Sequence, residues 1–299
     1  MAEMGNVTIV EVGPRDGFQN VANFIPTGEK AEIINMLVDA GEKQIEFSSF
    51  VHPKWIPQLA DAGELYTFIK NRTGVGFRAL IPNEKGLERA IGSGVQEVIW
   101  VLDATDSGNL ANLNMTTEQS LELARDIDRR VKENRMKLDG IIAHALGHPK
   151  EGDTSVEKVI RIAQVFREIG ITNITIADSI GIASPQKVRQ VVPSLIKALP
   201  DVRWGIHLHD ILGLGIANSL VAWESGITVF ESSIAGLGGC PYADHPGGNV
   251  ATEHLVYLFH KLGVDTGIDL DKLIKAREFV LSIVGEHLEK QIGHPSEEC

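Results

Sequence analysis

Two histidines separated by one residue form the clearest local signal for chemistry in this sequence. His207 and His209 stand in the stretch WGIHLHD, whose apolar residues are typical of a β-strand. Side chains two positions apart on a strand point to the same face. Two imidazoles on one face are good metal ligands. The alternative is one buried core histidine beside one surface residue.

An arginine and an aspartate lie side by side where the first apolar stretch ends. Arg15 and Asp16 stand in EVGPRDGFQN, at the end of the strand-like residues 7–12. Asp16 could provide a carboxylate ligand beside the two histidines. A guanidinium is always charged and offers a planar fork of donors, so Arg15 could stabilise a negative charge that develops next to the metal. The alternative is an ordinary ion pair at the surface.

Further ionisable residues lie within or after other apolar stretches. Glu46 and Asp178 could act as acid–base groups, or could only orient the arginine and the metal ligands. Asp103 follows a fourth stretch, and His144 and His148 follow a fifth. Burying so many charged groups without partners would be costly, so a metal ion or an anionic substrate is expected among them.

A glycine-rich stretch, AGLGGCPYADHPGGN, follows the last apolar run. Glycines allow a loop to move and let its backbone approach a ligand closely. Cys240 within this stretch is a candidate acid–base group or nucleophile, unless it is only a small apolar filler. Asn249 ends the stretch and could cap the next helix or give its amide oxygen to the metal.

These residues can meet only if the fold brings the ends of distant strands together. Apolar strand-like runs alternate with amphipathic helical patterns, such as EKAEIINMLVDAG and TTEQSLELARDIDRRVKENR. Several helical patterns end in glycine just before the next strand, as helix C-termini do. The eight predicted strands are 7–12, 44–48, 75–81, 97–102, 140–145, 173–177, 203–208 and 229–234.

Eight strand–helix pairs in 299 residues predict an α/β fold, the (β/α)8 TIM barrel. An open doubly wound sheet is the alternative, but it usually has fewer strands and a glycine-rich dinucleotide turn, where this chain has GPRDG. We expect a single catalytic domain, residues 1–299, with the barrel in 1–268 and a C-terminal helical extension in 269–299. A helix over 269–288 would pack outside the barrel. Because barrel enzymes react at the C-terminal ends of their strands, this fold would gather the candidate residues.

The composition limits the partners. A net charge of -12 argues against nucleic acid and against an anionic membrane surface, although a local site can still bind a small anion. Two cysteines, Cys240 and Cys299, make no disulfide framework and indicate a reducing compartment. The strand pattern begins too early for a signal peptide, and no apolar run approaches the ~18 residues that span a bilayer. We therefore expect a cytoplasmic protein, and a homo-oligomer is left open.

Five stretches make the chain resemble the 3-hydroxy-3-methylglutaryl-CoA lyases, which share a metal-dependent barrel superfamily with isopropylmalate and homocitrate synthases. They are VEVGPRDGFQN, IEFSSFVHPKWIPQLAD, IADSIGIASP, HLHD and AGLGGCPYADHPGGNVATEHLVYL, spread over residues 10–258. GLGGCPYA with a following GN is specific to the lyase branch. The resemblance implies a divalent cation, Mg²⁺ or Mn²⁺, whose ligands would be Asp16, His207, His209 and Asn249.

The same resemblance implies roles for other residues. Arg15 would stabilise the enolate oxygen of the reaction. Glu46 and Asp178 would be supporting active-site carboxylates, and Cys240 would be the loop thiol that takes part in proton transfer.

The implied reaction is a retro-Claisen cleavage of a 3-hydroxyacyl-CoA thioester. For the family substrate, the products are acetyl-CoA and acetoacetate. Asp16 and His207 are the candidates for the base that removes the 3-hydroxyl proton. Two other kinds of enzyme remain open. One is an acyl-CoA condensing enzyme that runs the reverse chemistry. The other is a barrel metallohydrolase, in which we would expect further metal ligands and no function for Arg15.

Three stretches depart from the family pattern around the acyl part of the substrate. HDILGLG replaces more polar residues, GHPKEG introduces His148 and Lys150, and LDATDSGN stands where the family has a Ser-Ala-Ser-Glu-like stretch. We therefore expect this protein to share the reaction class of the family, whereas the acyl group of its substrate can differ from that of the family substrate. The residues expected to contact the substrate are Arg15, Gln19, His144, His148, Ile211 and Leu214.

Overall fold

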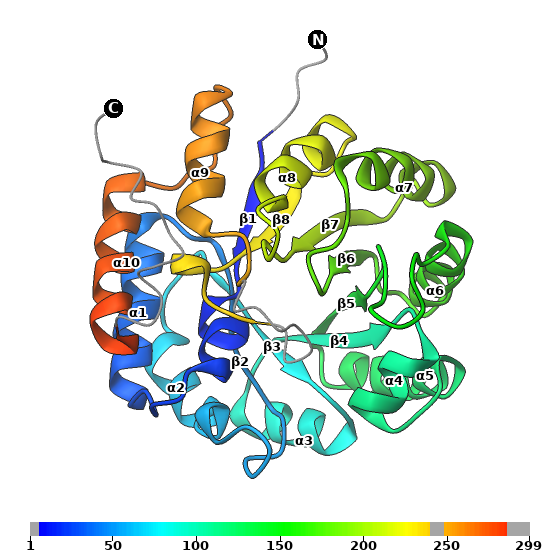
Figure 1. Cartoon of the computed structure of the whole chain (residues 1–299). Helices are drawn as coiled ribbons and strands as arrows, with labels where there is room; N and C mark the ends of the chain where they lie inside the picture. Colours follow the sequence, from blue (N-terminus) through cyan, green and yellow to red (C-terminus); the bar gives the residue numbers. More distant parts are fainter. Residues whose placement is uncertain (1–5, 240–247, 286–299) are drawn as a thin grey trace.

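Strands and helices alternate along the chain and close into a barrel (Figure 1). The computed structural model describes residues 6–239 and 248–285. The eight strands are parallel and hydrogen-bonded in chain order, and β8 returns to pair with β1, with Val229 opposite Thr8. The predicted (β/α)8 barrel is therefore confirmed, and the open doubly wound sheet is wrong.

All eight predicted strands form, with small shifts at their ends. The largest shift is in β5, which begins at Lys137 rather than at Gly140. The register of β5 follows from its neighbour, because Glu97 at the start of β4 pairs with Lys137. The strands are β1 (Thr8–Glu11), β2 (Gln44–Ser49), β3 (Gly76–Ile81), β4 (Glu97–Asp103), β5 (Lys137–Ala143), β6 (Asn173–Asp178), β7 (Arg203–Leu208) and β8 (Val229–Ser232).

The helices surround the barrel and follow the sequence signals for their ends. Thr116 and Gln119 form a capping box at the start of α5, and Gly41 and Gly94 end α1 and α3 in the left-handed conformation. The α-helices are α1 (Thr27–Ala40), α2 (Ala62–Ile69), α3 (Glu84–Ser93), α4 (Asp106–Leu113), α5 (Thr117–Glu133), α6 (Val156–Glu168), α7 (Pro185–Ala198), α8 (Gly215–Glu224), α9 (Thr252–Lys261) and α10 (Leu270–Val284).

The main apolar core and the barrel interior differ in chemistry. The large core cluster combines one face of the strands with the buried faces of the helices. Two small apolar clusters, one around Val10 and Val229 and one around Ile99 and Ile141, are separate from it. Since neighbouring residues on a strand face opposite sides, these clusters lie on the inner face of the sheet. Buried charged groups, among them Arg78 and Glu231, share that interior.

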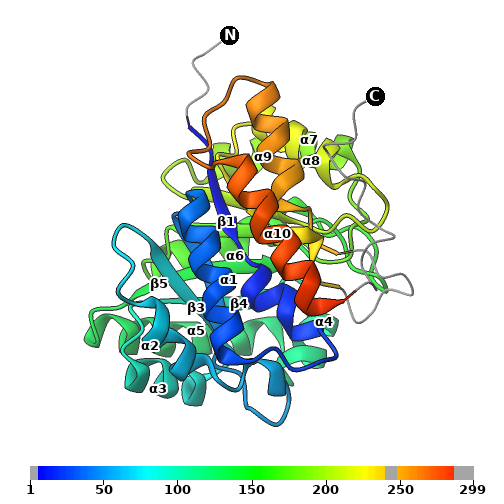
Figure 2. The same ribbon diagram turned by 90° about the vertical axis from the view of Figure 1, so that its left-hand side faces the viewer.

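The extra C-terminal helix packs against the first helix of the barrel. Figures 1 and 2 show α10 beside α1 along much of its length. Asp269 caps α10, and its backbone N–H donates to the carbonyl of Ala40 at 2.7 Å. The predicted helix is confirmed over Leu270–Val284, and its expected last residues, 286–288, lie outside the described part of the chain.

The position that ends α1 has room only for glycine, so a larger residue at Gly41 is expected to destabilise the fold. Gly41 has φ 114°, and a Cβ there would lie 2.3 Å from the carbonyl oxygen of Gly267. Gly41→Ala should therefore lower the free energy of unfolding by roughly 2–4 kcal/mol, measured by urea denaturation. Gly94→Ala is the matched control, because Gly94 has φ 76° and open space around its Cβ position; it should cost only about 1 kcal/mol. Equal losses in the two variants would contradict the close approach.

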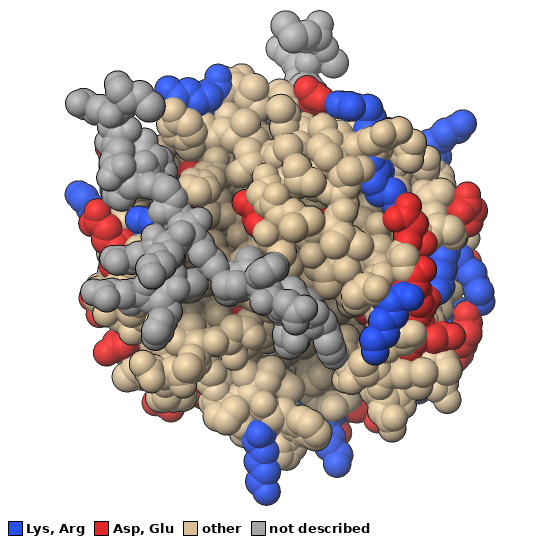
Figure 3. Space-filling model, viewed as in Figure 1, with Lys and Arg blue, Asp and Glu red and all other residues tan. Residues whose placement is uncertain are grey.

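Charged side chains are unevenly spread over the face shown in Figure 1. Most Lys and Arg side chains lie toward the edge of the molecule in this view, and uncharged residues fill most of the centre (Figure 3). Among the described helices, none combines the length and the apolar character that a bilayer crossing requires.

Candidate active site

A tight helical turn directly after β1 places the first two candidate residues. The turn η1 (Gly13–Gly17) has π-type geometry, which is frequent at functional sites. The N–H of Phe18 donates to the carbonyl of Gly13, five residues earlier, and the N–H of Asp16 donates to the carbonyl of Val12 at 2.7 Å. Gly17 must be small, since a Cβ there would lie 2.7 Å from the Leu237 side chain. The turn is thereby held against the loop that follows β8.

Arg15 is a buried residue with two carboxylate partners. Its Nη1 lies 2.5 Å from Asp16 Oδ1, and its Nε donates to Glu46. Arg15 is 8% exposed and Glu46 is fully buried. Burial alone would lower the pKa of the Arg15 guanidinium, but Glu46 and Asp16 raise it. The pair is therefore not an ordinary surface ion pair, and Arg15 keeps its charge inside the barrel mouth.

Asp16 is surrounded by donors that keep it ionised. Its Oδ1 accepts from Arg15 and from Gln19 Nε2 at 2.9 Å, and its Oδ2 accepts from Asn249 Nδ2 at 2.7 Å. Burial alone would raise its pKa, but Arg15 and the two histidines of β7 lower it below the usual value. Asp16 is therefore a carboxylate at neutral pH, as a metal ligand must be.

The two histidines at the end of β7 face Asp16. Their ring centroids are 5.2 Å apart. Burial alone would lower the pKa of His207, but Glu231 and Asp16 raise it above its usual value. Burial and the neighbouring His207 lower the pKa of His209 to about 4. In the absence of an ion, His209 is therefore neutral and can offer a nitrogen lone pair.

These three side chains and Asn249 fit a metal ion. Asp16, His207 and His209 each offer a ligand atom, and these atoms lie within 4.8 Å of one another. A backbone bridge sets Asn249 opposite His209, and the buried Oδ1 of Asn249 has no hydrogen-bond partner among the described residues. Two nitrogens and two oxygens suit several divalent ions. The predicted metal ligands are thus brought together, and an ion would satisfy the unpaired oxygen.

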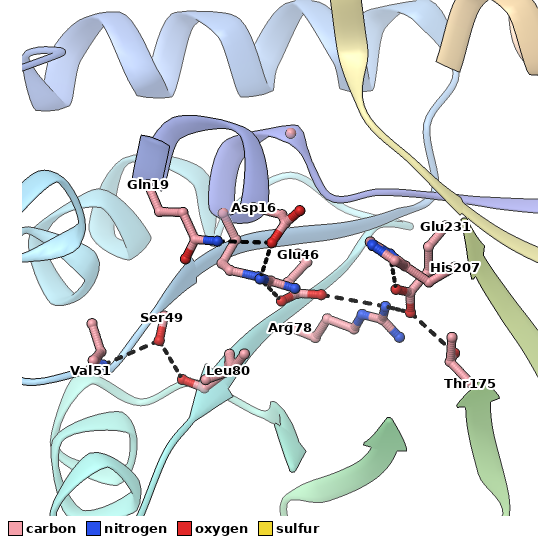
Figure 4. A network of polar contacts seen from close by, with 12 residues as sticks. Asp16, Gln19, Glu46, Ser49, Val51, Arg78, Leu80, Thr175, His207 and Glu231 are labelled. Carbon is pink, nitrogen blue, oxygen red and sulfur yellow. Dashed lines mark hydrogen bonds and ion pairs between the residues drawn. The ribbon is translucent and has the colours of Figure 1, made fainter. Parts of the chain in front are cut away.

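A buried ionic network extends from this group into the barrel. Glu231 of β8 accepts from His207 Nδ1 at 3.0 Å, from Arg78 Nη2 at 2.5 Å and from Thr175 Oγ1 at 3.1 Å (Figure 4). Arg78 also lies 3.6 Å from Glu46, the partner of Arg15. Burial would raise the pKa of Glu231, but Arg78 and His207 lower it to about 2. An ionised Glu231 holds the Nδ1–H of His207 and leaves its Nε2 for a metal.

Glu231 should therefore act on metal affinity through His207. Glu231→Gln should weaken Mn²⁺ binding by roughly 10–100-fold, the usual effect of losing a residue that orients a metal-bound histidine. Calorimetric titration with Mn²⁺ measures it. Glu42→Gln is the matched control, because Glu42 is a buried glutamate with no described contact to the site. Unchanged affinity in Glu231→Gln would show that other contacts orient His207.

The remaining predicted carboxylate has a different environment. Asp178 accepts the backbone N–H groups of Ile182 and Ala183 at 3.1 and 2.9 Å. Both bonds belong to the loop after β6, whose Ser179 lines the cavity at the site. These contacts order the loop after β6, and both predicted roles of Asp178, proton transfer and orientation of the arginine and the metal ligands, stay predictions.

One cavity of about 220 Å³ joins the metal group to an apolar wall. The residues of the metal group follow β1 or belong to the end of β7, whereas Leu80, Val101 and Ile141 of β3, β4 and β5 form the apolar wall, so one side is suited to chemistry and the other to an acyl group. The lining residues are Arg15, Asp16, Gln19, Leu80, Val101, Asn112, Ile141, Ala143, His144, Ala177, Ser179, His207, His209 and Gly239.

The other predicted contact residues lie outside this lining. His148 is buried behind His144, with ring centroids 4.7 Å apart. Ile211 lies against Gly181 of the loop after β6, and Leu214 is the residue before α8. Their contact with substrate stays a prediction. Cys240 lies outside the described residues, so its role in proton transfer also stays a prediction.

Comparison with known proteins gives a consistent result. A sequence profile described as HMGL-like matches residues 6–280. A mitochondrial hydroxymethylglutaryl-CoA lyase of Arabidopsis thaliana is 41% identical over 279 residues, which are 93% of this chain but 60% of that protein. Hydroxymethylglutaryl-CoA lyase YngG of Bacillus subtilis is 38% identical over 282 residues, 94% of each chain.

A solved structure agrees in fold as well as in sequence. It is an HMG-CoA lyase from Acinetobacter baumannii in complex with coenzyme A and 3-methylmalate, with a TM-score of 0.91 and 35% identity over 100% of this chain and 99% of that one. The resemblance read from the motifs is confirmed. Because the profile and these relatives each cover more than nine-tenths of the sequence, the chain belongs to the HMGL-like family.

Proposed function

We propose that this protein is a divalent-metal-dependent carbon–carbon lyase that cleaves 3-hydroxy-3-methylglutaryl-CoA to acetyl-CoA and acetoacetate. The observation that carries the proposal is the meeting of Arg15 with Asp16, His207 and His209 in one cavity. Relatives named hydroxymethylglutaryl-CoA lyase at 38–41% identity support the choice of substrate. The structure in complex with coenzyme A supports a CoA thioester.

Asp16, His207, His209 and Asn249 would hold the ion. Their mixed nitrogen and oxygen donors favour Mg²⁺ or Mn²⁺ over softer metals. When bound, such an ion acidifies a substrate hydroxyl and polarises a neighbouring oxygen.

Asp16 is the better placed of the two candidate bases. Its two carboxylate oxygens allow one to bind an ion while the other accepts the proton of the 3-hydroxyl group. His207 has only Nε2 left once Nδ1 donates to Glu231, so it cannot fill both roles. Loss of the hydroxyl proton lets the bond between C2 and C3 break, which leaves a ketone and the enolate of acetyl-CoA.

Arg15 would stabilise that enolate. Its charge is fixed by Glu46 and Asp16 inside a buried site, where an oriented donor costs no reorganisation during the reaction. Cys240 would then return a proton to C2 and complete acetyl-CoA. One proton leaves the hydroxyl group for Asp16 and one is added to the carbon from Cys240, so the balance closes when the proton on Asp16 passes back to the Cys240 thiolate after product release.

The apolar wall leaves room for other acyl groups. We expect measurable cleavage of 3-hydroxy-3-methylglutaryl-CoA, and the altered stretches around the acyl site allow a differently substituted 3-hydroxyacyl-CoA to be a better substrate. One apolar group shifts discrimination by only ~1–3 kcal/mol, whereas a polar contact shifts it more.

Product analysis tests the proposal. The protein is incubated with Mg²⁺ or Mn²⁺ and a panel of 3-hydroxyacyl-CoA thioesters, and acetyl-CoA, free CoA and the ketone are quantified. Acetyl-CoA and acetoacetate in equal amounts are expected from the methylglutaryl thioester. Free CoA without acetyl-CoA would point to hydrolysis instead. Net condensation of acetyl-CoA with a keto acid, without cleavage, would favour a condensing enzyme.

A further inference from the structure

A second buried histidine lies in the same cavity, and a carboxylate fixes it. His144 follows β5 and Asp103 ends β4, and His144 Nδ1 lies 2.6 Å from Asp103 Oδ2. Both residues are buried, 5% and 3% exposed. His144 is one of the residues expected to contact the substrate, and neither member of the pair holds the ion or transfers a proton in the proposed reaction.

Asp103 is held rigidly in its place. Its Oδ1 accepts the backbone N–H and the hydroxyl of Thr105, both at 2.8 Å. Asn109 bonds to the Asp103 backbone in both directions, at 2.9 and 2.6 Å. Gly108 leaves the space that the carboxylate fills, since a Cβ there would lie 1.9 Å from Asp103 Oδ2. The carboxylate is therefore an oriented acceptor.

The backbone and ring of His144 are equally constrained. His144 has a left-handed conformation with φ 49°, uncommon for a residue other than glycine. Its N–H donates to Ser179 Oγ at 3.0 Å, and its carbonyl accepts from Thr154 Oγ1 at 2.7 Å. The ring of His148 packs against it edge-on. Unusual backbone conformations held by surrounding bonds cluster at functional sites.

The carboxylate decides which nitrogen of His144 faces the ligand. Because an ionised Asp103 can only accept, Nδ1 carries a proton toward it. Nε2 is buried and has no hydrogen-bond partner among the described residues. With Asp103 accepting at Nδ1 and an anionic group accepting at Nε2, the ring that fits both partners carries a proton on each nitrogen. The pair can therefore present an N–H donor to an anionic group.

The pair stands across the barrel mouth from the metal group. In the closed strand order, β4 and β5 lie opposite β8 and β1, and Figure 1 shows the same arrangement. His144 and Arg15 nevertheless line one cavity. A substrate whose reacting carbons lie beside Arg15 and Asp16 would therefore extend its acyl end toward His144.

We propose that His144, oriented by Asp103, binds the distal carboxylate of the acyl group and so selects 3-hydroxyacyl-CoA thioesters that carry one. This inference rests on the proposed function and names the substrate class of that site. His144 is a specificity-determining residue, and Asp103 is a positioning residue that acts through it. The reacting carbons are left to Arg15 and the metal ligands.

Two thioesters that differ only at the distal group test this contact. One is 3-hydroxy-3-methylglutaryl-CoA, and the other is its analogue with a distal carboxamide. His144→Asn suits the test, because asparagine tolerates the left-handed backbone. It should lower kcat/KM for the carboxylate substrate by roughly 10–150-fold, the range of a hydrogen bond to a charged group, and change the carboxamide value by less than about threefold.

Asp103→Asn and Asp128→Asn complete the design. Asp103→Asn removes the negative charge that holds the Nδ1 side of the ring, so the preference for the carboxylate should fall by about tenfold, since charge-assisted bonds are stronger than neutral ones. Asp128→Asn is the matched control and should keep the preference, because Asp128 is a similarly buried aspartate on α5 that has no described contact to His144 and does not line the cavity. If His144→Asn lowers both substrates equally, or changes neither, the inference is wrong.

The proposed function is judged separately, by the wild type alone. If the wild-type protein releases no acetyl-CoA from either thioester, the proposed function fails. The contact between His144 and the distal carboxylate is then tested by binding, from the affinities of the wild type and of His144→Asn for the two thioesters. A carboxylate preference in binding that disappears in His144→Asn supports the contact, and an unchanged preference overturns it.

Discussion

Replacing Arg15 with glutamine should lower turnover by at least about 10²–10³-fold and leave metal binding nearly unchanged. A single donor that stabilises a developing oxyanion is typically worth roughly 3–4 kcal/mol, and Arg15 adds a full charge. The guanidinium has five N–H donors; Asp16 and Glu46 accept from Nη1 and Nε, so other N–H groups remain for substrate. Glutamine keeps an amide donor but loses both the charge and the planar fork.

The measurement must separate catalysis from the loss of a buried ion pair. Arg15→Gln leaves Glu46 fully buried with Arg78 as its nearest cation, at 3.6 Å. The double variant Arg15→Gln with Glu46→Gln removes that unbalanced charge. If turnover stays low in the double variant while its urea stability recovers, the loss belongs to catalysis. Recovered turnover in the double variant, or near-wild-type turnover in Arg15→Gln, would make Arg15 a structural partner only.

The fold could be predicted because its signals are local and repeated. Alternating strand and helix patterns define each unit, and glycines such as Gly41 and Gly226 mark where helices end, with φ 114° and φ 106°. Eight parallel units then have few arrangements, and the closed barrel is the one that buries every strand. The exact ends of the strands were harder to predict, because hydrogen bonds to neighbouring strands decide them. An example is β5, which begins earlier than predicted because its first residues pair with β4.

The site could be predicted where a polar residue ends an apolar stretch. Arg15, Asp16, His207 and His209 have that position, and the barrel brings them together. Glu231 was not among the predicted site residues, because it lies inside an apolar stretch rather than at its end. The available signal was its spacing from Val229, an inward position on β8, where a charged residue needs a buried partner.

Pairs across strands need the register, which a single sequence does not contain. Asp103 and His144 were both expected at the barrel mouth, but nothing in their own stretches joins them. In the structure Asp103 pairs with Ala143, which places the next residue, His144, beside the carboxylate. The loop after β7 shows the opposite case, since closeness in sequence to His209 did not bring Ile211 into the cavity lining.

Removing the divalent ion should have a similarly large effect, with a loss of turnover of at least about 10³-fold. A bound ion stabilises transition-state charge by several kcal/mol. Among the described lining residues, Arg15 is the one Arg or Lys side chain, and it is assigned to the enolate oxygen, so no cationic side chain is left to act on the substrate hydroxyl group. Chelation should abolish acetyl-CoA release, and added Mg²⁺ or Mn²⁺ should restore it.

His209→Ala should reproduce the effect of chelation while the barrel stays folded, since a residue at the barrel mouth contributes little to core packing. Thermal unfolding with and without Mn²⁺ provides a measurement independent of turnover: an ion that binds only the folded state raises the midpoint, in the wild type but not in His209→Ala. His148→Ala is the matched control, as His148 is 6% exposed and His209 7%, and it should keep the Mn²⁺-dependent rise. If His209→Ala keeps the rise and the turnover, the ion binds elsewhere and the assignment of Asp16, His207, His209 and Asn249 as its ligands is wrong.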